Sequence, residues 1–317
     1  MDVMTLMLSP QPRRSRTMQP DAALRRLFRE MRDMYAITGV TGQVGGAVAR
    51  ALLAQGAAVR AVVRDAAKGE SWRAMDCEVA LAGYDDEAAL ARAFTGVDGV
   101  FLMMPPDYDP APGFPQIHAL AERFRGAIER ARPGRVLFLS TVGAHVAEPN
   151  LLNNARLMEQ ALGRLPMPIA FLRPAWFMEN AAWDLPGARE GVIHSFLQPI
   201  DHRIPMVSVD DIGAVAAELL LRGWDGCLVQ ELEGPRRYGA EDIAQAYAAV
   251  LGHPVRAAAV PRGQWEALFR QQGAHHPEPR MRMLDGFNEG WIAFEGVPRR
   301  AATSLETALR RIAQRVA

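Results

Sequence analysis

A glycine-rich turn follows the first strongly apolar segment after the N-terminal region. Gly39, Gly42 and Gly45 form the pattern G-x-x-G-x-x-G directly after residues 35–38 and open an alanine- and leucine-rich stretch. The first glycine permits a tight turn, the second lets the backbone approach a pyrophosphate, and the third lets a helix pack closely on a strand. Amides at a helix N-terminus attract phosphate. The turn therefore predicts a dinucleotide site.

The end of the second expected strand bears on the choice between NAD and NADP. Folds that prefer NAD place an acid there to bind the ribose 2′-hydroxyl. Here Arg64 stands at or beside that position, and Lys68 follows one helical turn later. A guanidinium–phosphate bond contributes roughly 1.5–3 kcal/mol, which corresponds to about a ten- to hundredfold preference. We expect NADP(H) to be preferred, with Asp65 as an acid that could favour NAD instead.

Alternating apolar elements must position these residues. Short β-branched runs are expected as strands at residues 35–38, 59–63, 78–82, 100–103, 136–139 and 169–172, separated by helices at 45–55, 66–75, 86–94, 117–130 and 151–162. Continuous apolar strands fit a sheet that is covered on both faces. The order predicts an α/β fold with a doubly wound parallel sheet of the Rossmann type.

The alternation breaks after Arg173, which suggests three regions in the chain. Residues 1–33, rich in proline and arginine, are expected to be a flexible extension, and residues 34–190 an NAD(P)-binding Rossmann domain. Residues 191–317 are expected to form a smaller, mixed substrate lobe in which residues 205–232 return to the sheet. Helices are expected there near residue 210 and at 240–251, 262–271 and 304–316.

Composition excludes several classes of protein. The 317 residues contain 36 basic and 36 acidic side chains, so no global charge favours nucleic acid or an anionic membrane. No apolar run reaches the length of a membrane span, no G-x-S-x-G nucleophile elbow is present, and His275-His276 lacks a third ligand at zinc spacing. Cys77 and Cys227 are far apart in sequence, and we expect them to be reduced in a cytoplasmic protein.

Five segments together resemble the NmrA-like family of atypical short-chain dehydrogenases/reductases. They are T-G-V-T-G-Q-V-G at 38–45, V-R-A-V-V-R at 59–64, G-V-D-G-V-F-L at 96–102, L-R-P-A-W-F-M-E-N at 172–180 and V-S-V-D-D-I at 207–212. The resemblance extends from about Met34 to the C-terminus. It implies a Rossmann domain that binds NAD(P) and a small C-terminal substrate lobe.

The resemblance also implies roles for individual residues. Thr41, Gly42, Gln43 and Val44, beside Gly39 and Gly45, would hold the pyrophosphate, and Arg64 the 2′-phosphate. Met103 and Pro105 would line the cofactor, Ser140 and Thr141 would lie beside the nicotinamide, and Pro174 and Phe177 would meet the carboxamide, with Trp176 and Asn180 near the substrate.

The catalytic acid is harder to identify. The Tyr-x-x-x-Lys pair common in this superfamily is excluded, because Lys68 is the only lysine and no tyrosine lies between Tyr108 and Tyr238. Many relatives carry Lys or His four residues before the glutamate that is Glu159 here, and this chain has Ala155. Tyr108 and His145 remain as weak candidates for a proton donor, each of which could equally be a simple loop residue.

Two functions remain open at this stage. An NADP(H)-dependent oxidoreductase could reduce a small apolar acceptor, such as a quinone or a conjugated carbonyl or imine, because the cofactor supplies most of the chemistry. The aromatic residues of the second half suit a planar substrate site, although such residues are also common in cores. The alternative is a non-catalytic redox sensor that binds NADP(H) and acts through a protein partner. A homodimer is also possible.

Overall fold

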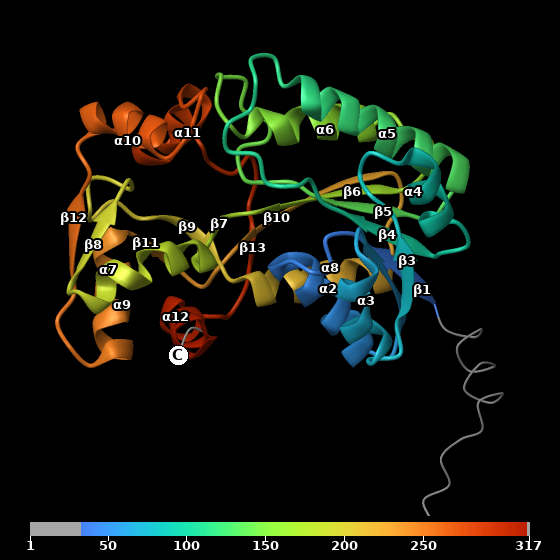
Figure 1. The fold of residues 1–317 in the computed structure, drawn as a ribbon, viewed down its shortest axis with the longest axis horizontal. Helices are drawn as coiled ribbons and strands as arrows, with labels where there is room; N and C mark the ends of the chain where they lie inside the picture. Colours follow the sequence, from blue (N-terminus) through green and yellow to red (C-terminus); the bar gives the residue numbers. More distant parts are fainter. Residues whose placement is uncertain (1–32, 316–317) are drawn as a thin grey trace, which may run out of the picture. The chain divides into compact units, whose positions relative to one another are not determined.

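Eight parallel strands form the central sheet (Figure 1). The computed structural model describes residues 33–315, so the predicted extension at residues 1–33 lies outside the described residues except for Asp33. The strands are β1 (Met34–Ile37), β2 (Ala58–Val63), β3 (Glu78–Leu81), β4 (Gly99–Leu102), β5 (Val136–Leu139), β6 (Ile169–Pro174), β10 (Cys227–Glu233) and β13 (Arg299–Arg300). Their order, β3-β2-β1-β4-β5-β6-β10-β13, confirms the predicted doubly wound sheet. The order reverses between β1 and β4, which is where such sheets bind ligands.

Helices cover both faces of this sheet, as Figure 1 shows. One face carries α2 (Gln43–Ala54), α3 (Ala66–Arg73) and α8 (Val209–Arg222), and the other carries α4 (Glu87–Phe94), α5 (Pro115–Ala131) and α6 (Asn153–Leu162). All four residues of β5 are buried: Leu137 and Leu139 belong to the core under α2 and α8, whereas Val136 and Phe138 belong to the core under α4–α6. This double burial explains why the strand has no polar face. None of the helices within residues 33–315 could span a membrane.

Helices α2 and α8 approach each other unusually closely. A Cβ atom added to Gly213 of α8 would lie 2.6 Å from the Cβ of Ala47 in α2. The contact therefore depends on a glycine opposite an alanine, since any larger pair would push the helices apart. It holds α2, and with it the glycine turn at its start, in a fixed place over the sheet.

A second group of elements surrounds its own apolar core. It contains a three-stranded sheet of β11 (Arg237–Tyr238), β9 (Ile204–Val207) and β7 (Trp176–Phe177), and a two-stranded sheet of β12 (Arg256–Ala259) and β8 (Val192–Ser195). Its helices are η1 (Met178–Asp184), α7 (Leu185–Arg189), α9 (Ala240–Leu251), η2 (Arg262–Gln264), α10 (Trp265–Gln271), α11 (Glu278–Glu289) and α12 (Leu305–Arg315). Trp265, Tyr247 and Phe269 are fully buried at its centre.

The second half differs most from the sequence expectations. Helix α9 has the predicted bounds, but the short strands of the two small sheets and helix α11 were not predicted. Strand β7 has only two residues, too few for a periodic signal, and α11 contains Pro279 in its first turn. The proposed domain boundaries at residues 190 and 191 stay a prediction.

Candidate functional site

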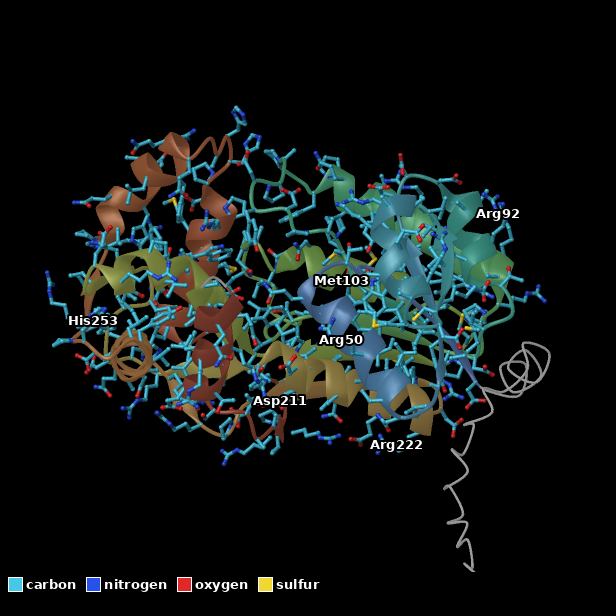
Figure 2. All side chains as sticks on the ribbon, turned by 60° about the horizontal axis from the view of Figure 1, so that its bottom comes forward. Arg50, Arg92, Met103, Asp211, Arg222 and His253 are labelled. Carbon is cyan, nitrogen blue, oxygen red and sulfur yellow. The ribbon has the colours of Figure 1, made fainter. Side chains whose placement is uncertain are left out.

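The glycine turn between β1 and α2 is shaped by close backbone contacts. Gly39 has a φ of +62°, and a Cβ there would lie 2.3 Å from the Met103 sulfur, which Figure 2 shows over the start of α2. A Cβ on Gly45 would lie 2.4 Å from the Gly39 carbonyl oxygen and 2.6 Å from that of Thr38. At Gly42 the nearest atom, the Gly39 oxygen, would be 3.3 Å away. The first and third glycines therefore allow tight packing, and the second leaves an open cradle.

The N-terminus of α2 is accessible at this cradle. Gly42 is the N-cap, with extended backbone and no capping side chain, and Thr41, Gly42 and Gln43 are exposed while Val44 is buried. A 12-residue helix leaves its first amides without intrahelical partners and places a partial positive charge there. These residues fit a pyrophosphate group.

Arg64 and Asp65 follow β2 directly, and of the two only Asp65 forms a side-chain hydrogen bond with a residue between 33 and 315. The Asp65 carboxylate accepts a hydrogen bond from the Ala67 amide at 2.9 Å and caps α3. Arg64 is exposed and forms no ion pair with the residues that the structure describes. The acid that could have favoured NAD thus serves as an N-cap, and the guanidinium is available to a ligand.

A buried ion cluster lies where β5 and β6 end. The Arg173 guanidinium donates to both carboxylate oxygens of Glu159, at 2.9 and 2.7 Å, and to Glu295 at 3.0 Å. Glu231 lies 4.0 Å away and accepts the backbone amides of Glu295 and Gly296. The hydrogen bonds that Arg173 donates to Glu159 are the main cause that raises the pKa of Arg173. We call Glu159, Arg173, Glu231 and Glu295 the Arg173 cluster.

Ser140 belongs to the surroundings of this cluster. Its hydroxyl donates to Glu159 at 2.5 Å and its side chain is buried, as is that of Pro174. Thr141, the next residue, is half-buried and lines a neighbouring cavity. Of the two residues expected beside the nicotinamide, Thr141 therefore has the side chain that is accessible from the cavity.

A cavity of about 530 Å³ adjoins the end of β6 and the second group of elements. Its aromatic lining consists of Tyr108, Trp176, Phe177, Trp183, Phe196 and Phe287. Its polar lining consists of Thr141, Asn180, Asp184, His194, Ser195, Gln272 and Arg280. The cavity thus brings together Trp176 and Asn180, which were expected near the substrate, and Phe177, which was expected at the carboxamide. It has the size and character of a small-molecule site.

The predicted proton donors lie in different places. Tyr108 lines the cavity, whereas His145 does not. His145 lies beyond the end of β5, where its carbonyl accepts a hydrogen bond from Arg156, and its Nδ1 atom is buried without a partner among the described residues. Ala155, where relatives carry Lys or His, is 2% exposed. Only Tyr108 is therefore positioned to meet a molecule in the cavity.

Asp184 is a cavity residue that the sequence analysis missed. Burial raises its pKa to about 7, and its carboxyl has no hydrogen-bond partner among residues 33–315. By contrast Glu179, also buried, accepts hydrogen bonds from Ser208 and the Val209 amide at the start of α8. Nothing in the spacing marks Asp184; its position beside Trp183 in an aromatic segment was the available signal.

The mouth of the cavity joins two distant segments of the chain. The Tyr108 and Trp183 rings meet edge to face at 6.1 Å, and the Asp109 carboxylate accepts the backbone amides of His275 and His276 at 2.8 and 2.5 Å. These hydrogen bonds lower the pKa of Asp109. Within residues 33–315 no group of three metal-ligating side chains is assembled.

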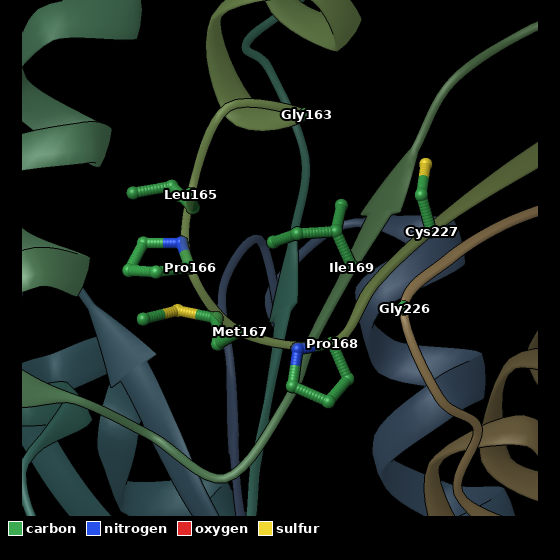
Figure 3. Close-up of a pocket in the computed structure, with 8 residues that line it drawn as sticks. All are labelled: Gly163, Leu165, Pro166, Met167, Pro168, Ile169, Gly226 and Cys227. Carbon is green, nitrogen blue, oxygen red and sulfur yellow. The ribbon is translucent and has the colours of Figure 1, made fainter.

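A smaller cavity of about 350 Å³ lies at the other end of the strands, lined by the starts of β6 and β10 (Figure 3). Pro168 and Ile169 form one side, and Gly226 and Cys227 the other. Ligands of doubly wound sheets bind at the carboxyl ends of the strands, so this cavity is separate from the cofactor crevice.

Three curated or solved reductases are similar to this chain. A (4-alkanoyl-5-oxo-2,5-dihydrofuran-3-yl)methyl phosphate reductase of Streptomyces griseus is 32% identical, over 70% of this chain and 76% of its own. An NAD(P)H azoreductase of Xenophilus azovorans is 27% identical, over 81% and 85%. The NADPH complex of a quinone oxidoreductase from Escherichia coli superposes with a TM-score of 0.73 at 23% identity, covering 90% of this chain and all of that one.

The fold is also that of a triphenylmethane reductase from Citrobacter, with a TM-score of 0.74 at 19% identity over 89% of this chain and 99% of that one. The model of the NmrA-like family matches residues 31–284, which include the glycine turn, Arg64, the Arg173 cluster up to Glu231 and most of the cavity. The resemblance seen in the sequence is therefore confirmed, and this chain belongs to the NmrA-like family.

Proposed function

We propose that this protein uses NADPH to reduce a small, planar, apolar acceptor, such as a quinone or a conjugated carbonyl or imine. The coarser assignment, an NAD(P)H-dependent oxidoreductase of the atypical short-chain type, follows from the family and from the reductases that it resembles. The observation that supports the finer proposal best is the 530 Å³ cavity with aromatic walls, which begins beside Thr141 and Phe177.

The residues present fit a dinucleotide. The amides at Thr41 and Gln43 would hold the pyrophosphate over Gly42, whose own amide donates to the Gly39 carbonyl at 2.9 Å, and Arg64 would hold the 2′-phosphate. Met103 and Pro105 would lie along the cofactor, with Ser140, Thr141, Pro174 and Phe177 at the nicotinamide end. When bound, the nicotinamide supplies the hydride.

The chain's own residues would position the acceptor and supply a proton. The rings of Trp176 and Phe287, which meet edge to face at 5.1 Å, offer an apolar wall that excludes water, and Asn180 offers an amide to a carbonyl oxygen. Asp184 would give its carboxyl proton to the oxygen or nitrogen of the acceptor as the hydride adds to it, and would then regain a proton from water.

The test is NADPH oxidation with a panel of quinones, followed at 340 nm. We expect steady turnover with at least one planar acceptor. Tight NADPH binding without turnover on quinones, conjugated carbonyls or imines would instead support a redox sensor.

Arg64→Ala tests the cofactor assignment. We expect the dissociation constant of NADPH to rise about ten- to hundredfold, because a charge-assisted bond to the 2′-phosphate is lost, and that of NADH to stay almost unchanged. Arg73→Ala is a matched control, since Arg73 stands at the far end of α3 and pairs with Glu70. Equal losses for NADPH and NADH in the Arg64 variant would contradict the assignment.

A further inference from the structure

We propose that Arg280 forms an anion subsite in the 530 Å³ cavity, which selects acceptors carrying a carboxylate, sulfonate or phosphate group beside their planar ring. This inference rests on the proposed function, because it concerns the same cavity. The aromatic walls indicate an apolar, planar acceptor. The Arg280 subsite would require that this acceptor also carry an anionic group.

The first argument is that the Arg280 side chain lacks the acidic partner that four other arginines of this group of elements have. Arg262 and Arg282 both pair with Asp285, at 2.6 and 3.4 Å, and Arg203 and Arg236 both pair with Asp242. Arg280 forms neither an ion pair nor a hydrogen bond with any residue from 33 to 315. Arg280 is therefore a half-buried arginine at the cavity wall without a counter-ion among the described residues.

The second argument is the environment of the guanidinium. It lies over the Phe269 ring, 4.2 Å from its centre, and 5.6 Å from the centre of the Tyr108 ring. Burial lowers the pKa of Arg280, and no carboxylate offsets this effect. The rings hold the planar group in place but offset only part of the cost of burying a cation. An arginine side chain remains charged, so an anion that enters the cavity would supply the missing countercharge.

The third argument concerns the other ionisable groups of the cavity. Asp184, His194 and Tyr108 line it together with Arg280. Asp184 is protonated over much of the range below about pH 7, so it does not repel an anion there. A guanidinium donates in a planar fork that matches two oxygens of a carboxylate, sulfonate or phosphate, and the chemical class of the ligand follows from that geometry.

A pair of probes that cannot be reduced tests the subsite separately from turnover. Naphthalene-2-sulfonate and naphthalene-2-sulfonamide share the same planar ring system, but at pH 7 the sulfonate is an anion and the sulfonamide is neutral. Their binding can be measured by isothermal titration calorimetry. In Arg280→Met, we expect affinity for the sulfonate to fall at least about tenfold and affinity for the sulfonamide to change less than about twofold. Arg280→Lys should retain part of the affinity for the sulfonate.

The matched control is Arg282→Met, two residues along the same helix, where the arginine pairs with Asp285 and does not line the cavity. It should leave binding of both probes unchanged. Equal losses of the two probes in Arg280→Met, or no loss of either, would overturn the subsite. Arginine-dependent sulfonate binding without turnover of any quinone, conjugated carbonyl or imine would overturn the proposed reaction and leave the subsite in place.

Discussion

Arg173 and Arg280 are both withdrawn from solvent, yet their surroundings are opposite. Arg173 is 5% exposed and has three carboxylates around it, two of them in direct contact. Arg280 lines the cavity beneath two aromatic rings and has no carboxylate partner among the described residues. A buried charge that the fold neutralises is part of the structure, whereas one that it leaves unpaired at a cavity wall is available to a ligand.

The same contrast holds for the acids. The Glu159 carboxylate accepts hydrogen bonds from Arg173 and from the Ser140 hydroxyl. The Glu179 carboxylate accepts the Val209 amide at the start of α8. Asp184 has no hydrogen-bond partner among the described residues, and burial raises its pKa. Glu159 and Glu179 are therefore held by partners within the fold, whereas the carboxyl of Asp184 is available in the cavity.

Arg173→Met tests the structural role of the neutralised arginine, and it should lower the free energy of unfolding more than any other variant considered. Removal of the guanidinium leaves Glu159 and Glu231 buried without their counter-ion, so we expect a loss of about 3–5 kcal/mol in the free energy of unfolding. Urea denaturation followed by circular dichroism measures it. Arg299→Met removes an exposed pair with Glu218 and should cost less than about 1 kcal/mol. Similar losses of unfolding free energy in both variants would show that the Arg173 cluster stabilises the fold no more than an exposed ion pair does.

Asp184→Asn should alter the pH dependence of stability. The carboxyl ionises at about pH 7 in the folded chain and near 3.8 when unfolded, so raising the pH between these values destabilises the folded wild-type protein. We expect the variant to gain about 3 kcal/mol over wild type as the pH rises from about 4 to 7, with a constant difference above about pH 8. Urea denaturation at pH 5, 6, 7 and 8 measures it. A difference that does not vary with pH would mean that Asp184 ionises at its ordinary value.

Arg280→Met should have the smallest effect on stability, about 1 kcal/mol or less, because only ring contacts are lost and an unpaired buried charge disappears. The same denaturation experiment measures it. A loss as large as that expected for Arg173→Met would assign Arg280 a structural role, and the contrast between the two arginines would fail.

The sheet could be predicted from the sequence because its glycine turn and its buried strands are determined by residues that lie close together in the chain. The spacing of Gly42 and Gly45 reflects their close contacts with the backbone of Thr38 and Gly39, and the four apolar residues of β5 reflect cover on both faces. Ser140 was placed at the correct end of β5, but its bond to Glu159 joins residues 19 positions apart and could not be inferred from spacing.

The roles of some charged residues could not be predicted from the sequence, because they depend on which partners lie nearby in three dimensions. Arg280 is one of 35 arginines, and what distinguishes it is its place at the cavity wall without a carboxylate partner among the described residues, which is visible only in three dimensions. Asp65 was considered as a ribose ligand, and its hydrogen bond with the Ala67 amide, which makes it a helix cap, could not be read from its position in the sequence. In such cases the residue type is visible in the sequence, and the partner that decides its role is not.

The position of the single lysine gives the protein a practical property. Lys68 is exposed in the first turn of α3, and the next residue, Gly69, packs so closely that an added Cβ would lie 2.7 Å from Val79. Helix and sheet thus fix the place of the only side-chain amine in the chain, four residues from Arg64. An amine-reactive dye therefore has one side chain to label, and it would attach a fluorophore beside the expected ribose end of the dinucleotide without any engineered cysteine.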